Sequence, residues 1–198
     1  VLKSLVSLVN AGSIIMSKLD NKIEARHRNL FDVLNAQKYT VDYFQREYSW
    51  GEKHIEELVT DLTSAFLNEY TVGDSREQGE NYNNYYLGPF VVSSKDGKRS
   101  IIDGQQRLTT ISLLLLAMYN LMKNGVLTPE KGNLAEKIYK TYLIDEWQDD
   151  DTRIKLKPVK NDRNAFGKLF DEESEHIPDS NLTINYNYFY SRIQKEEI

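Results

Sequence analysis

The stretch from Ile101 to Leu108, IIDGQQRL, has the residue types of an anion-binding turn. An apolar run ends at Asp103, Gly104 permits a sharp turn, and the next helix opens with two amides and a guanidinium, those of Gln105, Gln106 and Arg107. The first turn of a helix leaves backbone N–H groups unpaired and carries about half a positive charge. A phosphate fits such a place, because Gly104 admits it close to the backbone and Arg107 can donate two hydrogen bonds. The stretch predicts a phosphate-binding site.

Asp103 predicts a metal ion at the same place. Its carboxylate repels a phosphate unless a cation lies between them, and Mg²⁺ is held by one or two carboxylates together with substrate phosphates. Gln105 or Gln106 can orient a water for in-line attack, as a glutamine does in small GTPases. We therefore predict four catalytic residues, of which the first is also the metal ligand: Asp103, Gln105, Gln106 and Arg107.

A structural interpretation of the same stretch stays open. An Asp before a Gly is an ordinary helix start, and Arg107 can simply pair with Asp103. The chain has no GxxxxGK[ST] phosphate loop.

A second stretch, residues 44–50 (FQREYSW), leads straight into a predicted helix. Gln45 and Arg46 there are candidate phosphate or nucleotide contacts, and Tyr48 and Trp50 are candidate stacking faces for a base. In the alternative interpretation the two aromatic residues pack in the core and Arg46 makes a surface ion pair.

A third stretch, Tyr86–Pro89, places a glycine and a proline inside a predicted strand. This is typical of a sheet edge, a bulge, or a place where another backbone or a ligand comes close.

The elements that must position these stretches follow from the residue pattern. We predict an extended segment over 39–48 and a helix that opens with a capping box at Ser49–Glu52 and ends near Tyr70. Residues 73–84 predict a loop. Residues 85–102 predict a β-hairpin, because they contain an Asp-Gly pair between two strand-like runs and tight hairpin turns need positive φ angles at both central residues.

The remaining predicted elements are mainly helical. Residues 108–123 form a helix that is apolar on all sides and therefore central. Further helices are predicted over 29–37 and 134–143, from a cap at Asn161, and from about Leu182, with a short strand over 153–158. The order of elements predicts an α+β fold: a small mixed sheet with a β-hairpin, packed against a mainly helical remainder.

Composition excludes several classes of protein. The 198 residues contain no cysteine, which excludes disulfides, Cys-ligated zinc and thiol catalysis and fits a reducing cytoplasm. The three histidines have no paired metal-ligand spacing. Lys+Arg 25 against Asp+Glu 30 gives a net charge of −5, which is unfavourable for a protein that coats DNA without regard to sequence. No apolar run is long enough to cross a membrane, so we expect a cytoplasmic protein.

The three stretches in this order, FQREYSW, YYLGPFVV and IIDGQQRLTT, resemble the N-terminal domain of GmrSD-type, modification-dependent (type IV) restriction endonucleases. This resemblance implies a ParB/sulfiredoxin-like fold and an NTP-binding and hydrolysing site. Asp103 to Arg107 match the family's DGQQR motif, and Gln45 and Arg46 match its upstream QR. The implied cofactor is Mg²⁺ with the NTP, in a regulatory module of an anti-phage endonuclease.

The resemblance also predicts the domain organisation and partners. We interpret residues 1–28 as an N-terminal extension, in which residues 1–15 are a vector remnant, an upstream extension or a docking helix and Met16 is a plausible native start. Residues 29–198 are interpreted as the GmrSD-type domain. Within it, a ParB-like core covers about 29–125 and a helical part about 126–198. Family members carry a C-terminal HNH-type nuclease domain, whose motif does not occur here, and the implied partner of the intact protein is DNA, modified or unmodified.

The chain departs from the family pattern in one further way, and two alternative functions stay open. The family usually has Ile-Pro before the FQR string, where this chain has Val41-Asp42. One alternative is a non-catalytic, ParB-like module in which the same loop grips a DNA phosphate and Tyr43, Tyr48 or Trp50 holds a flipped base. The other is an α+β scaffold that only docks another subunit.

Overall fold

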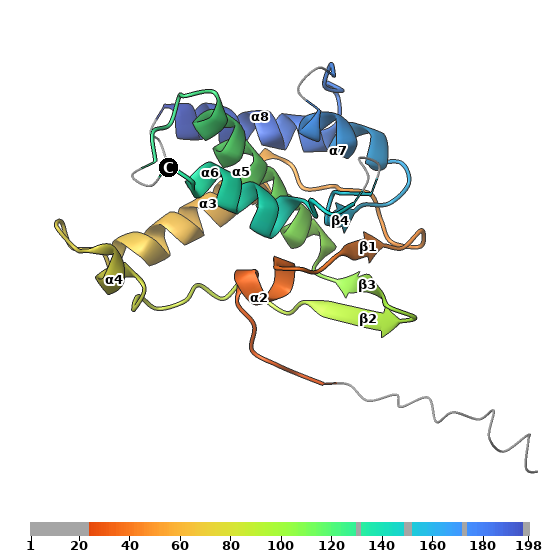
Figure 1. The fold of residues 1–198 in the computed structure, drawn as a ribbon, viewed down its shortest axis with the longest axis horizontal. Helices are drawn as coiled ribbons and strands as arrows, with labels where there is room; N and C mark the ends of the chain where they lie inside the picture. The colour runs from red at the N-terminus through yellow and green to blue at the C-terminus, as the bar shows by residue number, and fades with distance from the viewer. Residues whose placement is uncertain (1–23, 130–131, 149–151, 172–173, 196–198) are drawn as a thin grey trace, which may run out of the picture.

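The computed structural model describes residues 24–129, 132–148, 152–171 and 174–195 (Figure 1). Its strands are β1 (Tyr39–Val41), β2 (Val91–Lys95), β3 (Lys98–Asp103) and β4 (Leu156–Lys157). Its helices are α2 (Leu30–Leu34), α3 (Glu52–Leu67), α4 (Arg76–Gly79), α5 (Gln105–Lys123), α6 (Leu134–Ile138), the π-helix η1 (Tyr139–Leu143), α7 (Arg163–Phe170) and α8 (Asn181–Gln194). The predicted N-terminal extension lies outside these residues except for positions 24–28.

The four strands form one mixed sheet in the order β2-β3-β1-β4. β2 and β3 are antiparallel, whereas β1 is parallel to both β3 and β4. The α+β prediction with a small mixed sheet is confirmed. Because Val41 lies opposite Ile101, the chain leaves β1 and β3 at the same edge of the sheet, and this brings the second and first motif stretches together.

The predicted hairpin turn is confirmed. Asp96 and Gly97 have φ angles of 51° and 74°, and Lys95 pairs with Lys98 across the turn. Positive φ at both central positions matches the right-handed twist of the two strands, which is why Asp-Gly is favoured there.

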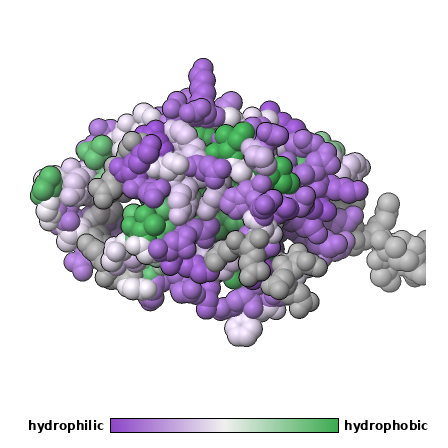
Figure 2. All heavy atoms as spheres, turned by 90° about the horizontal axis from the view of Figure 1, so that it is seen from above, coloured by the Kyte–Doolittle hydropathy of each residue, from purple (hydrophilic) through white to green (hydrophobic). Residues whose placement is uncertain are grey.

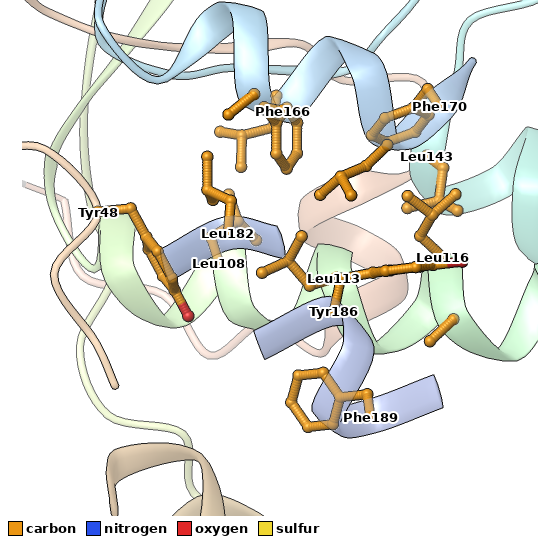
Figure 3. Packing of buried hydrophobic residues seen from close by; sticks show 14 of the residues in the cluster. Tyr48, Leu108, Leu113, Leu116, Leu143, Phe166, Phe170, Leu182, Tyr186 and Phe189 are labelled. Atoms are coloured by element: carbon orange, nitrogen blue, oxygen red, sulfur yellow. The ribbon is translucent and has the colours of Figure 1, made fainter. Parts of the chain in front are cut away.

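The central helix α5 packs along α8 and forms the middle of the core (Figures 1 and 3). Leu113, Leu116 and Phe189 are almost completely buried between these helices, and Phe166 of α7 lies in the same cluster. The prediction of a central helix buried on nearly all sides is confirmed. The face drawn in Figure 2 is mainly hydrophilic with small separate hydrophobic patches. Among the described helices, none is long and apolar enough to cross a membrane.

Three predicted strands are shorter than expected. The strand predicted over 153–158 comprises only Leu156–Lys157. The strand predicted over 39–48 ends at Val41, where a turn closed by Gln45 N–H donating to the Asp42 carbonyl (3.0 Å) stops it. The strand predicted from Tyr85 begins only at Val91. Gly88 has φ +91°, which breaks an extended backbone, and the carbonyls beside it bond to a side chain instead of a strand.

Two predicted helix caps are displaced. The cap of α3 is Gly51, not Ser49, because the Ser49 N–H is already bonded to Gln106. The cap of α7 is Asp162, not Asn161. The predicted loop over 73–84 also contains the short helix α4.

Candidate functional site

The start of α5 leaves several backbone donors without a partner. Gly104 is the N-cap residue, with φ +95° and no side chain to cap the helix, and the first helical bond is from Leu108 N–H to the Gly104 carbonyl. The N–H groups of residues 105–107 make no hydrogen bond to any described residue, although Gln105 and Gln106 are largely buried. Buried backbone donors almost always have a partner, so this end of the helix can accept an anion or water.

Gly104 is required where it stands. A Cβ at this position would lie 2.8 Å from Cδ2 of Phe90, and the left-handed backbone is unfavourable for any other residue. The turn between β3 and α5 therefore depends on a glycine, as the sequence predicts.

Asp103 lies at the mouth of this turn. Its side chain is 61% exposed, and its Oδ2 lies 3.5 Å from Nη2 of Arg107, so the predicted ion pair is present but long. Within the described part of the chain, no group of three or more His, Cys, Asp or Glu side chains could hold a metal ion by itself. A single exposed carboxylate can hold Mg²⁺ when the phosphates of a bound ligand supply other oxygen ligands to the ion.

Arg107 fixes the third stretch against α5. Its Nη1 donates to the Leu87 carbonyl (2.6 Å) and its Nη2 to the Pro89 carbonyl (2.7 Å). A Cβ on Gly88, between them, would lie 2.1 Å from Nη1. The predicted close approach at this glycine is found, with a guanidinium as the approaching group. Two donors of Arg107 are thus committed to the protein.

The two glutamines, which the sequence does not distinguish, have different surroundings. Gln106 is bonded at both ends of its amide, with Oε1 accepting from Ser49 N–H (2.8 Å) and Nε2 donating to the Glu47 carbonyl (3.0 Å). Gln105 uses only its Nε2, which donates to the Arg46 carbonyl (3.2 Å) and, at 3.4 Å, to Oε1 of Gln45. Its Oε1 has no hydrogen-bond donor among the residues the structure describes. Gln105 can therefore accept from a ligand or water, whereas Gln106 is structural.

The upstream pair lies beside this helix start, as predicted. Gln45 Nε2 donates to the Ile102 carbonyl (3.1 Å), so its side chain spans the gap between β1 and β3. The Arg46 side chain is exposed, and no carboxylate of the described residues pairs with it. The surface ion pair of the alternative interpretation is thus absent there, and the guanidinium is available to a ligand.

The two aromatic candidates differ. Tyr48 is 7% exposed and lies in the core cluster (Figure 3). Its hydroxyl lies 2.7 Å from Oγ1 of Thr110 and accepts from Asn185 Nδ2 (3.0 Å), and burial raises its pKa to about 12. The core-packing interpretation holds for Tyr48, because its ring is closed to a stacking base. Trp50 is half-buried and stacks on the His54 ring, with 5.6 Å between the ring centres.

The family model described as GmrSD restriction endonuclease, N-terminal domain, matches residues 28–198. The chain belongs to this family. No curated protein matches the chain. The predicted membership of this family is thereby confirmed.

In this GmrSD N-terminal domain, α7 and α8 hold the second stretch by residues outside every motif. Asp162 Oδ2 accepts from the Tyr48 N–H (2.7 Å), and Asn185 Nδ2 donates to the Trp50 carbonyl (2.8 Å) as well as to Tyr48. Burial raises the pKa of the Asp162 carboxyl, and the nearby Glu47 adds to the rise. Sequence reasoning missed both residues.

A signal for Asn185 was present in the sequence of the GmrSD domain. It lies three residues after Leu182 and four before Phe189, on the stripe that α8 buries. An amide on a buried apolar stripe is expected to bond a backbone group, because an unpaired amide there is unfavourable. Hydrogen bonds from α5, from the cap of α7 and from α8 thus hold residues 47–50 in place.

Proposed function

We propose that this domain binds and hydrolyses a nucleoside triphosphate at the start of α5. The observation that carries the proposal is the set of unpartnered N–H groups of residues 105–107, which face the end of a sheet where two parallel strands finish. Crevices beyond the carboxyl ends of parallel strands commonly bind ligands. The family to which the chain belongs consists of restriction endonuclease domains, for which we propose that nucleotide turnover gates DNA cleavage by a nuclease domain.

The phosphate contacts are divided unequally between the two arginines. Arg46 supplies the direct contact, because its guanidinium has no partner among the described residues. Arg107 is a positioning residue, since its Nη atoms are bonded to Leu87 and Pro89. Asp103 would hold Mg²⁺, which supplies charge neutralisation on the phosphate oxygens.

The hydrolytic step follows from the free end of Gln105. Its Oε1 accepts a hydrogen bond from a water and aims that water at the terminal phosphorus. A P–O bond forms to the water as the bond to the bridging oxygen breaks, giving a nucleoside diphosphate, phosphate and a proton. Gln106 keeps residues 47–49 in place and takes no part in the step.

Thermal unfolding with each of the four common NTPs and Mg²⁺ tests the binding. A ligand at about 100 times its Kd adds about 2.7 kcal/mol. For a chain of this size that corresponds to roughly 5–11 °C in Tm. Asp103→Ala should remove the shift, whereas Asp179→Ala, an exposed Asp outside the site, should retain it. An equal shift in both variants, or none in the parent with any nucleotide, contradicts the proposal.

A second candidate function rests on one observation. Tyr43 and Phe44 protrude from the turn after β1, with exposed fractions of 91% and 62%, and their rings meet edge to face at 5.7 Å. Protruding aromatic rings beside the free Arg46 suit stacking on an unpaired DNA base. Tyr43→Ala should then weaken binding of a mismatch-containing duplex while leaving the nucleotide shift unchanged. Equal binding by the variant excludes this function.

A further inference from the structure

The sheet is electrostatically polarised along its strands. β3 ends at the carboxyl edge with Asp103, β1 is followed there by the turn from Asp42, and β4 ends with Lys157, whereas lysines gather at the amino ends of these strands. Lys95 pairs with Lys98 across the hairpin. When the pairing of β1 is extended by two residues against β3 and by one residue against β4, Lys38 lies level with Lys98 and with Lys155. One row across the sheet therefore consists of four lysines.

Three members of this row are open to solvent to different degrees. Lys95 and Lys98 are exposed, and Lys38 is half-buried, donating to the Thr152 carbonyl (2.6 Å) and lying 3.6 Å from Asp145. Lys155 is buried instead, and its Nζ donates to the carbonyls of Lys140 and Thr141 (3.1 and 2.6 Å). Lys155 thus anchors the strand, and the other three form the charged surface.

Further cations line a groove of about 660 Å³ that runs beside this row, between β4 and α7. The charged side chains that line it in the described part of the chain are five cations and one acid: Lys38, Arg153, Lys155, Lys157, Arg163 and Asp171.

This concentration of positive charge is unexpected in a chain of net charge −5. Like charges directly opposite each other on neighbouring strands repel, so the exposed pair of Lys95 and Lys98 is unfavourable without an anionic partner. Strands lie about 4.7–4.9 Å apart, and a row of three therefore extends over roughly 10 Å. One strand of a DNA duplex presents a phosphate about every 3.4 Å along the axis, so such a row faces several phosphates at once.

We infer that the amino edge of the sheet, formed by Lys38, Lys95 and Lys98, together with Lys157 in the groove beside β4, binds the phosphate backbone of double-stranded DNA. This site is separate from the proposed nucleotide site, which lies at the opposite ends of the same strands. Its contacts go to phosphates and carry no base sequence. The edge orients the duplex on the domain, and recognition of modification or sequence is left to other groups.

The test measures binding of the whole chain to a labelled duplex of about 20 base pairs, between roughly 50 and 200 mM salt. The variant replaces three exposed lysines by glutamine: Lys95→Gln, Lys98→Gln and Lys157→Gln. The matched control removes the same charge elsewhere, from α3, α6 and the end of α8: Lys53→Gln, Lys137→Gln and Lys195→Gln. Circular dichroism confirms that each variant is folded.

We expect the edge variant to bind the duplex about tenfold more weakly than the parent at low salt. The slope of log K against log salt should become less steep by about 0.9 per lost contact, or roughly 2.7 for three contacts. The control should stay within about twofold of the parent. Absence of duplex binding by the parent, or equal losses in both variants, overturns the inference.

Two further measurements identify the chemical class of the ligand and the edge of the sheet that binds it. Poly-glutamate should compete poorly with the duplex; competition as effective as that of unlabelled DNA would assign the edge to acidic proteins and overturn the inference. Asp103→Ala should bind the duplex as well as the parent. Because this variant removes a carboxylate that repels phosphate, a higher affinity would move the DNA contact to the carboxyl edge and would leave the nucleotide proposal to be judged by thermal unfolding alone.

Discussion

The two edges of the sheet are built on different physical principles. At the carboxyl edge, side chains from α5, from the cap of α7 and from α8 bond to backbone groups of residues 46–50, so the backbone beside the unpartnered groups is fixed by defined hydrogen bonds. At the amino edge the exposed lysines of β2 and β3 make few bonds. The first edge suits a ligand recognised by shape and hydrogen bonds, and the second a ligand recognised by charge density. Substitutions at the first should therefore change stability, and those at the second mainly salt-dependent binding.

The largest effect on stability is expected from Gly88→Ala. The new Cβ would collide with Nη1 of Arg107 and displace the guanidinium from two carbonyls, and φ +91° is itself unfavourable for Ala. We expect a loss of about 3 kcal/mol in the free energy of unfolding, measured with urea.

Gly97→Ala is the matched control for this substitution. Gly97 also has positive φ, but a Cβ there meets nothing within 4 Å. Its loss should be about 1–2 kcal/mol, the backbone cost alone. Equal losses in the two variants would show that the bonds of Arg107 contribute nothing to stability.

The two glutamines should separate stability from turnover. Gln106→Ala leaves the Ser49 N–H and the Glu47 carbonyl without a partner, which we expect to cost about 2 kcal/mol of unfolding free energy. Gln105→Ala should cost less stability and yet abolish phosphate release from the NTP, because its free Oε1 is proposed to hold the water. If the Gln105 variant retains full turnover, the assignment of the water to that residue is wrong.

Tyr48→Phe should have a smaller effect at neutral pH, about 1 kcal/mol, because it removes a hydroxyl bonded to Thr110 and Asn185. The effect depends on pH. The folded pKa of about 12 lies above the ordinary value of 10.0, so only the unfolded chain loses the proton between these values, and stability falls as pH rises through this range.

The phenylalanine variant lacks that titration, and its stability should decline less than that of the parent between pH 10 and 12. Urea unfolding at several alkaline pH values measures the difference. Parallel decline in both proteins would mean that other tyrosines, among them Tyr39 with its raised pKa, dominate alkaline unfolding.

The sequence was sufficient for local features and insufficient for long-range ones. The Asp-Gly hairpin turn, the Gly104 turn and the buried helix α5 could be predicted because each depends on adjacent residues. The brace made by Asp162 and Asn185 could not, since it joins positions more than a hundred residues apart. The strand after Val41 was overestimated for the same reason: aromatic and β-branched residues favour strands, but tertiary bonds to residues 46–49 outweighed that preference.

The roles of the two arginines show the same limit. Both Arg46 and Arg107 match phosphate-binding chemistry in sequence, and the carbonyls that engage Arg107 come from a loop about twenty residues earlier. A residue type predicts what a side chain can bind, whereas its partners in the fold decide which of those capacities remains available.

The smallest effect on stability, and the sharpest contrast between the edges, is expected from Lys98→Gln. This lysine lies opposite Lys95, so removing its charge relieves a repulsion, and the variant should be as stable as the parent or more stable by up to about 0.5 kcal/mol at low salt. Because salt screens exposed charges, the gain should vanish at about 1 M salt. Urea unfolding at the two salt concentrations measures it. A loss of stability that persists at high salt would mean that Lys98 is part of a fixed bonded structure like that of the carboxyl edge, and the distinction between the two edges would fail.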